Sequence, residues 1–155
     1  MLTINIPGRE PLTLRHLVLD YNGTIAVDGL LLQELIQPMQ ELGRSLELHV
    51  LTADTYGTAT AQCAGIPVQI HTFPRADAGS CKEKIVRALG AGVVCLGNGF
   101  NDIPMFQIAD LSIAVLLEEG LCAALLPHAD VLVRSALDGL TLLINQDRLR
   151  ATLRN

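Results

Sequence analysis

Short apolar runs alternate along the chain with longer stretches in which apolar residues recur every three or four positions. The runs that predict strands cover residues 2–6, 12–19, 46–51, 68–72, 93–96, 111–116 and 131–133. The stretches that predict helices cover residues 30–42, 56–64, 81–89, 119–126 and 137–153, with a further helix beginning near Asn101. Strands that alternate with helices favour an α/β fold. We expect a three-layer, Rossmann-like parallel sheet that binds ligands at the carboxyl ends of its strands.

The first apolar run is followed by a turn signal. Pro7 and Gly8 separate it from the next run, which predicts an N-terminal β-hairpin whose second strand continues into the core and ends at Asp20. Further along the chain, Ser80 is the expected N-cap of the helix at residues 81–89.

The composition fits a single domain over residues 1–155. Half of the residues are hydrophobic, and a chain of this length can bury a full core without metals or disulfides. The net charge of −5 argues against nucleic-acid binding, because phosphate backbones are bound by clustered Lys and Arg. The mean hydropathy of +0.38 is high for a monomer. We therefore expect part of the apolar surface to be buried in a homo-oligomer.

Cysteine and histidine usage adds two expectations. Four cysteines without C-x-x-C spacing predict buried free thiols and hence a reducing compartment. The N-terminus has no basic segment of the kind that begins a secretory signal, and no apolar stretch reaches the ~18 residues of a membrane span. We therefore expect a cytoplasmic protein. The histidines at positions 16, 49, 71 and 128 show no spacing typical of metal ligands, so structural roles are expected for them.

Polar residues follow two of the predicted buried strands. Asp20 begins the sequence Asp-Tyr-Asn-Gly-Thr, and the strand at residues 93–96 runs into Gly-Asn-Gly-Phe-Asn-Asp at 97–102. Taken singly, Asp20 could begin a turn and Asp102 could favour a helix N-terminus. Taken together, two strand-end loops that present oxygen atoms at one edge of a parallel sheet predict a site for a hard cation such as Mg²⁺.

Two further residues fit the same edge of the sheet. Thr52 ends the strand at residues 46–51 and could bind a phosphate oxygen, although a threonine there is also an ordinary turn residue. Lys82 lies near the start of a predicted helix and could neutralise a phosphoryl group, although it could equally be a solvated surface lysine.

The order of these residues resembles the four signature motifs of the haloacid dehalogenase superfamily. The motifs are an apolar run ending in Asp20-x-x-Gly23-Thr24, Thr52 at a strand end, Lys82-Glu-Lys-Ile-Val, and Gly97-x-Gly99-x-Asn101-Asp102. The likeness is strongest to the phosphorylation domain of P-type ATPases and its free-standing soluble relatives, and it spans about residues 12–140. The spacing between the motifs leaves no room for a cap domain.

The resemblance implies a Mg²⁺-dependent phosphohydrolase in which a carboxylate attacks phosphorus and forms an aspartyl phosphate. The implied catalytic residues are Asp20, Asn22, Thr52 and Lys82. The implied metal ligands are Asp20, the backbone carbonyl of Asn22, Asn98 and Asp102. The implied phosphate contacts are Gly23, Thr24, Thr52, Lys82 and Asn101, with Thr24 also orienting the nucleophile loop. The implied partner is a phosphorylated substrate, and ion transport by this chain alone is not expected.

Two positions depart from the superfamily pattern. Asn22 stands where phosphatases usually carry an Asp that acts as general acid and base, so a slow enzyme or one that accumulates phosphoenzyme is expected. Asn98 stands where the superfamily supplies a metal-binding carboxylate, so weaker Mg²⁺ affinity is expected. These departures leave open a non-catalytic, phosphate- or metal-binding regulatory relative of the ATPase phosphorylation domain. A detached partner of a membrane transporter is a further alternative.

Overall fold

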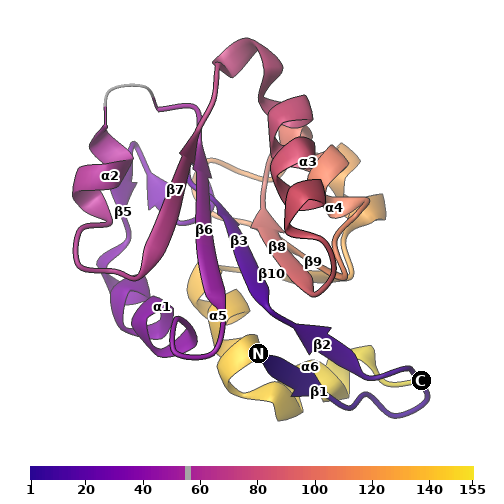
Figure 1. Cartoon of the computed structure of the whole chain (residues 1–155). Coiled ribbons are helices and arrows are strands. Elements are labelled where there is room, and N and C mark those ends of the chain that lie inside the picture. The colour runs from indigo at the N-terminus through magenta and orange to yellow at the C-terminus, as the bar shows by residue number, and fades with distance from the viewer. Residues whose placement is uncertain (55–56) are drawn as a thin grey trace.

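The computed structural model describes residues 1–54 and 57–155. Its centre is a six-stranded sheet with the order β10-β9-β8-β3-β6-β7, in which all adjacent strands are parallel (Figure 1). The strands are β3 (His16–Asp20), β6 (Glu47–Thr52), β7 (Val68–Thr72), β8 (Val93–Gly97), β9 (Leu111–Val115) and β10 (Val131–Val133). The central strands are rich in Val, Ile and Leu, because helices bury them on both faces. The predicted three-layer α/β fold is confirmed.

The helical elements alternate with the strands along the chain. The α-helices are α1 (Ile36–Leu42), α2 (Thr58–Gln62), α3 (Ala78–Leu89), α4 (Ile103–Phe106), α5 (Ala136–Ile144) and α6 (Gln146–Leu153). The 3-10 helices are η1 (Gln33–Leu35), η2 (Arg75–Asp77), η3 (Phe100–Asp102) and η4 (Ala123–His128). Within residues 1–54 and 57–155, no helix combines the length and the apolar character needed to cross a bilayer.

Each face of the sheet has its own apolar cluster. α1 and α5 pack on one face, against side chains that include Leu19 and Leu96. α3 and α4 pack on the other face, against side chains that include Val18 and Cys95. Figure 1 shows the two helical layers on opposite sides of the strands. Because successive residues of a strand point to opposite faces, β3 and β8 contribute to both clusters.

The order of the strands creates a crevice at one point of the sheet. The chain moves outward from β3 through β6 to β7, and then crosses back to β8 on the other side of β3 before continuing to β10. At such a reversal, the loops that leave adjacent strands diverge and open a crevice at the carboxyl ends. The crevice therefore lies where β3, β6 and β8 end.

Two small hairpins flank the sheet. They pair β1 (Leu2–Ile4) with β2 (Leu12–Leu14), and β4 (Ala26–Val27) with β5 (Leu30–Leu31). The second hairpin, called the flap here, turns through Asp28 and Gly29, which have φ values of 50° and 79°. A two-residue turn with positive φ at both positions matches the twist of the flanking strands. Among the described residues, the flap is the only strand pair between β3 and β6, and no cap domain is present.

Most predicted strands match the structure closely. The strands at residues 68–72 and 131–133 are confirmed at both ends, and those at 46–51 and 93–96 are confirmed to within one residue. The N-terminal hairpin is also confirmed. Its second strand, however, breaks at Arg15, where β2 ends and the chain enters the parallel sheet as β3.

Two predicted helices match the structure only in part. In the helix expected at residues 30–42, the first two residues form β5 because the flap turn pairs them with β4, and α1 starts only at Ile36. The helix expected at residues 56–64 corresponds to α2. Its predicted start at Tyr56 lies outside the described residues.

Two other predicted helices are interrupted. The expected helix at residues 119–126 is wrong. Gly120 turns the chain with a φ of 79°, and the next element is the 3-10 helix η4. Pro127 within η4 cannot donate a backbone hydrogen bond. The expected helix at residues 137–153 is two helices, because Asn145 has a ψ of 79° and so leaves the helical conformation between α5 and α6.

The N-terminus of α5 offers a test of helix capping. The Ser135 hydroxyl accepts a hydrogen bond from the backbone N–H of Asp138 at 3.0 Å. Ser135→Ala should lower the free energy of unfolding by about 1 kcal/mol in urea denaturation, because that N–H loses its partner. The predicted cap at Ser80 is wrong, since α3 already starts at Ala78, so Ser80→Ala is the matched control and should not destabilise the chain. Equal losses from both variants would contradict the assignment of the cap.

Candidate active site

The carboxyl ends of three adjacent strands bring predicted site residues together. Asp20 is the last residue of β3, Thr52 the last of β6, and Gly97 the last of β8. β3 pairs in parallel with both neighbours, so the three ends lie at one edge of the sheet. The functional groups are therefore held by rigid backbone beside the crevice.

Lys82 enters this site from α3, and only 2% of the residue is exposed. Its ammonium donates to Asp20 Oδ1 at 2.6 Å, to Asp102 Oδ1 at 2.6 Å and to Asn101 Oδ1 at 3.0 Å, which occupies all three of its N–H groups. The lysine thus joins the strand that carries Asp20 to the loop after β8. The interpretation of Lys82 as a solvated surface residue is wrong.

Asp102 is fully buried and holds the loop after β8 in place. Its Oδ2 accepts hydrogen bonds from the backbone N–H groups of Asn98 at 2.9 Å and Gly99 at 2.8 Å, while its Oδ1 accepts from Lys82. The carboxylate packs directly on Gly97, where an added Cβ would lie 2.6 Å from Asp102 Cγ. Asp102 therefore positions the loop and the lysine together.

The loop after β3 fixes the orientation of Asp20. Thr24 Oγ1 donates to Asp20 Oδ2 at 2.9 Å and lies 3.3 Å from Asn98 Oδ1. Gly23 turns the chain with a φ of 78°, and its backbone N–H donates to the carbonyl of Ala26. An added Cβ at Gly23 would come within 2.4 Å of Asn98 Nδ2. A glycine is therefore required there for its backbone conformation and for the close approach of the two loops.

The buried charges of the site do not balance. Two carboxylates, Asp20 and Asp102, surround one ammonium. Burial and the charge of Asp102 raise the pKa of Asp20 to about 7, against the opposing effect of Lys82. Burial on its own lowers the pKa of Lys82, but the two carboxylates outweigh burial and raise it, so the ammonium stays charged. With both carboxylates ionised, the site carries a surplus negative charge that a further cation would offset.

The residues around the crevice fit a hard divalent cation. Asp20, Asn22 and Asn98 line one cavity of about 200 Å³. The Asn98 amide donates its Nδ2–H to the carbonyl of Gly120 at 3.0 Å, which leaves its Oδ1 facing Thr24 in the loop after β3. Carboxylate, carbonyl and amide oxygens are the protein ligands that Mg²⁺ accepts. Asp102, predicted as a ligand, lies behind the cavity with both of its oxygens bound to donors.

Of the residues predicted to contact phosphate, three line the cavity and two lie behind it. Thr52, Lys82 and Asn101 line the cavity. Thr52 Oγ1 accepts a backbone N–H at 3.0 Å, which orients the hydroxyl so that it can donate its own proton. Gly23 and Thr24 lie behind Asp20, with the Gly23 N–H and the Thr24 hydroxyl bound within the nucleophile loop. In this arrangement they hold the loop and do not face the cavity.

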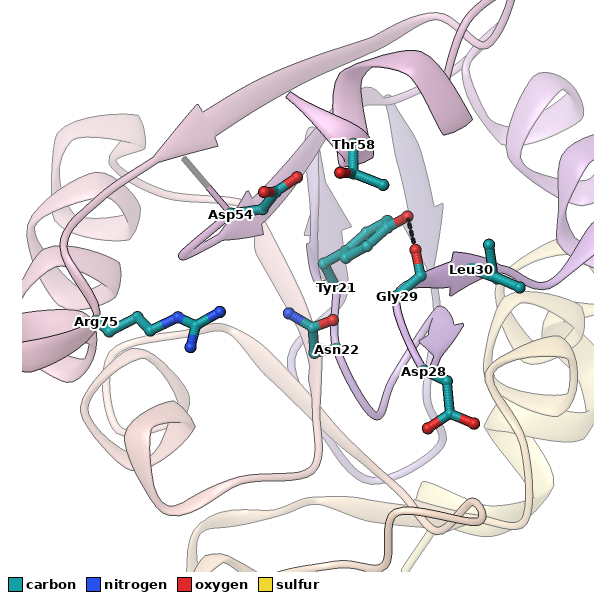
Figure 2. A pocket seen from close by; sticks show the side chains of 8 residues that line it. All are labelled: Tyr21, Asn22, Asp28, Gly29, Leu30, Asp54, Thr58 and Arg75. Carbon is teal, nitrogen blue, oxygen red and sulfur yellow. Dashed lines mark hydrogen bonds between the residues drawn. The ribbon is translucent and has the colours of Figure 1, made fainter. Parts of the chain in front are cut away.

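A second pocket, of about 300 Å³, adjoins the first at Asn22 (Figure 2). Its other lining residues are Tyr21, Asp28, Gly29, Leu30, Asp54, Thr58 and Arg75. The Tyr21 hydroxyl donates to the carbonyl of Gly29 at 3.0 Å, which ties the flap to the nucleophile loop. Figure 2 shows the guanidinium of Arg75 extended toward the side chain of Asn22. Arg75 was not predicted from the sequence, because no local motif marks it and only the fold brings η2 to this pocket.

Sequence comparison with known proteins relates the chain to an archaeal protein. No protein-family model matches it. An uncharacterized protein of Methanocaldococcus jannaschii is 38% identical over 63 residues, which are 41% of this chain and 68% of that protein. At this identity and coverage, the two proteins belong to one family.

Several solved structures share the architecture. A haloacid dehalogenase superfamily hydrolase of Legionella pneumophila is 14% identical, with a TM-score of 0.71 over 90% of this chain and 87% of that one. The 3-deoxy-D-manno-octulosonate 8-phosphate phosphatase of Moraxella catarrhalis, in complex with magnesium and phosphate ions, is 13% identical, with a TM-score of 0.71 over 91% and 94%. A zinc-transporting PIB-type ATPase is 25% identical, with a TM-score of 0.58 over 79% of this chain and 20% of the ATPase.

The central role of Lys82 can be tested by removing its charge. Lys82→Met leaves two buried carboxylates without their common partner, so the free energy of unfolding in metal-free buffer should fall by about 3–5 kcal/mol. Lys84→Met is the matched control, because Lys84 is exposed on the same helix, and it should change stability by less than about 0.5 kcal/mol. Similar stabilities for the two variants in urea denaturation would contradict the charge cluster.

Proposed function

The chain belongs by its fold to the haloacid dehalogenase superfamily, and from this premise we propose that it is a Mg²⁺-dependent phosphohydrolase that acts through an aspartyl phosphate. The observation that carries the proposal is the 2.6 Å distance between Lys82 Nζ and Asp20 Oδ1, at a cavity that Asn98 also lines. A carboxylate, an ammonium and oxygen ligands around one cavity are the parts that phosphoryl transfer uses. The likeness to a phosphatase that holds magnesium and phosphate supports the same function.

In the first step, a carboxylate oxygen of Asp20 attacks phosphorus while the bond between phosphorus and the leaving-group oxygen breaks. Thr24 holds the other carboxylate oxygen, so the nucleophile cannot rotate away. The Thr52 hydroxyl donates to an oxygen of the transferring phosphoryl group, and the positive charge of Lys82 stabilises the negative charge on that group. The products of this step are the aspartyl phosphate and the leaving group, which departs as an oxyanion and takes any proton it needs from solvent water.

In the second step, water attacks the phosphorus of the aspartyl phosphate, which releases inorganic phosphate and restores the Asp20 carboxylate. This step requires a base to accept a proton from the water. Asn22 lies between the two cavities, where a base would serve, but its amide neither accepts nor supplies a proton at neutral pH. We therefore propose that the second step is slow and that phosphoenzyme accumulates.

Asp20, the backbone carbonyl of Asn22 and Asn98 would hold the Mg²⁺ ion, with Asp102 fixing the loop behind them. When bound, the ion supplies positive charge that stabilises the transferring phosphoryl group. Because Asn98 contributes no charge, the protein's affinity for the ion is expected to be weaker than that of a site with an additional carboxylate.

The pocket beyond Asn22 is the proposed site of the leaving group. It adjoins the phosphoryl cavity at Asn22, and the side chains of Asp28, Asp54, Thr58 and Arg75 give it a polar lining. Such a lining suits a leaving group that offers several hydrogen-bonding groups. Closure by the neighbouring subunit of the expected homo-oligomer is part of the same proposal.

The proposal is tested with a panel of phosphomonoesters and acyl phosphates in the presence of Mg²⁺. The chain should release phosphate from at least one of them, and a labelled acyl phosphate should modify Asp20. Asp20→Asn should lose both activities. Asp147→Asn, which removes an exposed carboxylate from α6, is the control and should keep both. Equal turnover by Asp20→Asn and the unsubstituted chain would contradict the assignment of Asp20 as the nucleophile.

A gain-of-function variant tests the role of Asn22. Asn22→Asp supplies the missing acid and base, so breakdown of the phosphoenzyme should accelerate by about 10²–10⁴-fold, measured as loss of label from the protein. Asn5→Asp adds the same charge at an exposed position on the N-terminal segment and should leave the rate unchanged. An unchanged rate in Asn22→Asp at saturating Mg²⁺ would mean that proton transfer does not limit the second step.

The second candidate function is a phosphate- or metal-binding regulator without turnover. The observation that favours it is the replacement of two working carboxylates by Asn22 and Asn98 in a site whose remaining parts are intact. A regulator would bind phosphate or Mg²⁺ but would leave Asp20 unlabelled by the acyl phosphate.

A further inference from the structure

A row of histidines crosses β3, β6 and β7 diagonally, from the amino end of β3 to near the carboxyl end of β7. His16 opens β3, parallel pairing sets Glu47 of β6 beside it, and His49 lies two residues further along the same face. His16 Nδ1 lies 3.2 Å from His49 Nε2 and 3.6 Å from Glu47 Oε2. His49 Nδ1 in turn lies 3.1 Å from His71 Nε2 on β7. The expectation that the histidines share no ligand spacing is wrong, because the spacing arises across strands and not along the chain.

Three of these side chains have the geometry of metal ligands. The ligand atoms of His16, Glu47 and His49 all lie within 4.8 Å of one another. A tetrahedral Zn²⁺ ion with bonds of about 2.0–2.2 Å sets its ligands roughly 3.3–3.6 Å apart. The observed 3.2 Å and 3.6 Å are close to this separation, and the Glu47 side chain, which is 66% exposed, has the freedom to adjust. We propose that His16, Glu47 and His49 form a transition-metal site that takes Zn²⁺ or Co²⁺, with water as the fourth ligand.

The imidazole at the centre of the row is prepared for this role. His49 is only 1% exposed, and its two ring nitrogens face His16 and His71. With an ion on Nε2, the proton of His49 lies on Nδ1, where it donates to His71 Nε2. A hydrogen bond from the far nitrogen of a metal-bound histidine fixes the orientation of its ring. His71 is therefore a positioning residue for the site.

The histidine site is separate from the cavity at Asp20. His16 and Asp20 are the first and last residues of β3, so they are about 13 Å apart along the strand. Their donor sets also differ, because imidazole nitrogens favour Zn²⁺ and Co²⁺ whereas an all-oxygen set favours Mg²⁺. His16 borders a surface pocket of about 260 Å³, and the Glu47 side chain is 66% exposed, so the site lies at the surface.

The test is a titration of the full chain with Zn²⁺, followed by calorimetry. Excess Mg²⁺ is present to occupy the site at Asp20. The titration is repeated with the Asp20→Asn variant, which lacks the acidic ligand of that site. Both proteins should bind one equivalent of Zn²⁺ at the histidine site, and Co²⁺ should give the visible absorption of a tetrahedral ion. Glu47→Gln and His16→Gln should each raise the dissociation constant by at least about tenfold. Glu41→Gln, at an exposed position on α1, and His128→Gln, on η4, are the matched controls and should bind as the parent does.

The proposal is overturned if no Zn²⁺ binds in excess Mg²⁺, or if Glu47→Gln and His16→Gln both bind as tightly as their controls. It is also overturned if Asp20→Asn abolishes binding while the two histidine-site variants retain it, because the ion would then belong to the other site. Neither test variant replaces the buried His49, and circular dichroism of each variant establishes that it is folded.

Discussion

A buried ammonium between two buried carboxylates is the interaction on which the rest of this structure depends. Neither charge type is stable alone in an apolar interior, so α3, the end of β3 and the loop after β8 must be assembled together for any of the three groups to be satisfied. The parallel sheet brings the carboxylates to one edge, and α3 brings the lysine to them. With both carboxylates ionised, the same arrangement carries one negative charge in excess. The placement of three separate elements of the fold therefore depends on a single cluster.

The sequence was most informative where one local force decides the structure. Buried parallel strands read as continuous apolar runs, which is why residues 68–72 and 131–133 could be placed at both ends. Helical periodicity was less reliable, because tertiary pairing overrides it. The leucines at residues 30–31 have helical spacing with the apolar residues of α1, yet the flap pairs them as a strand. Asn145 likewise interrupts a continuous amphipathic pattern, and no glycine or proline marks the break.

The candidate site shows a similar division. Asp20, Thr52 and Asp102 could be located because each follows an apolar run, and the topology of parallel sheets gathers such ends in space. The burial of Lys82 could not be read from its exposed-looking helical context. Contacts between side chains on different strands could not be predicted from the sequence either, because they depend on how the strands pair. His16 and His49 meet only because of the register between β3 and β6, a quantity that no pattern within either segment encodes.

The amide at residue 98 is built into the architecture around it. Its Nδ2–H ties the loop after β8 to the carbonyl of Gly120, and its Oδ1 lies toward Thr24 across the contact with Gly23. An aspartate there would set a carboxylate oxygen against the Gly120 carbonyl, two acceptors with no proton between them. Asn98 therefore joins two loops by a hydrogen bond at a position where a carboxylate could have bound a metal ion. Conversion to a charged metal site would have to reshape the turn at residue 120 together with position 98.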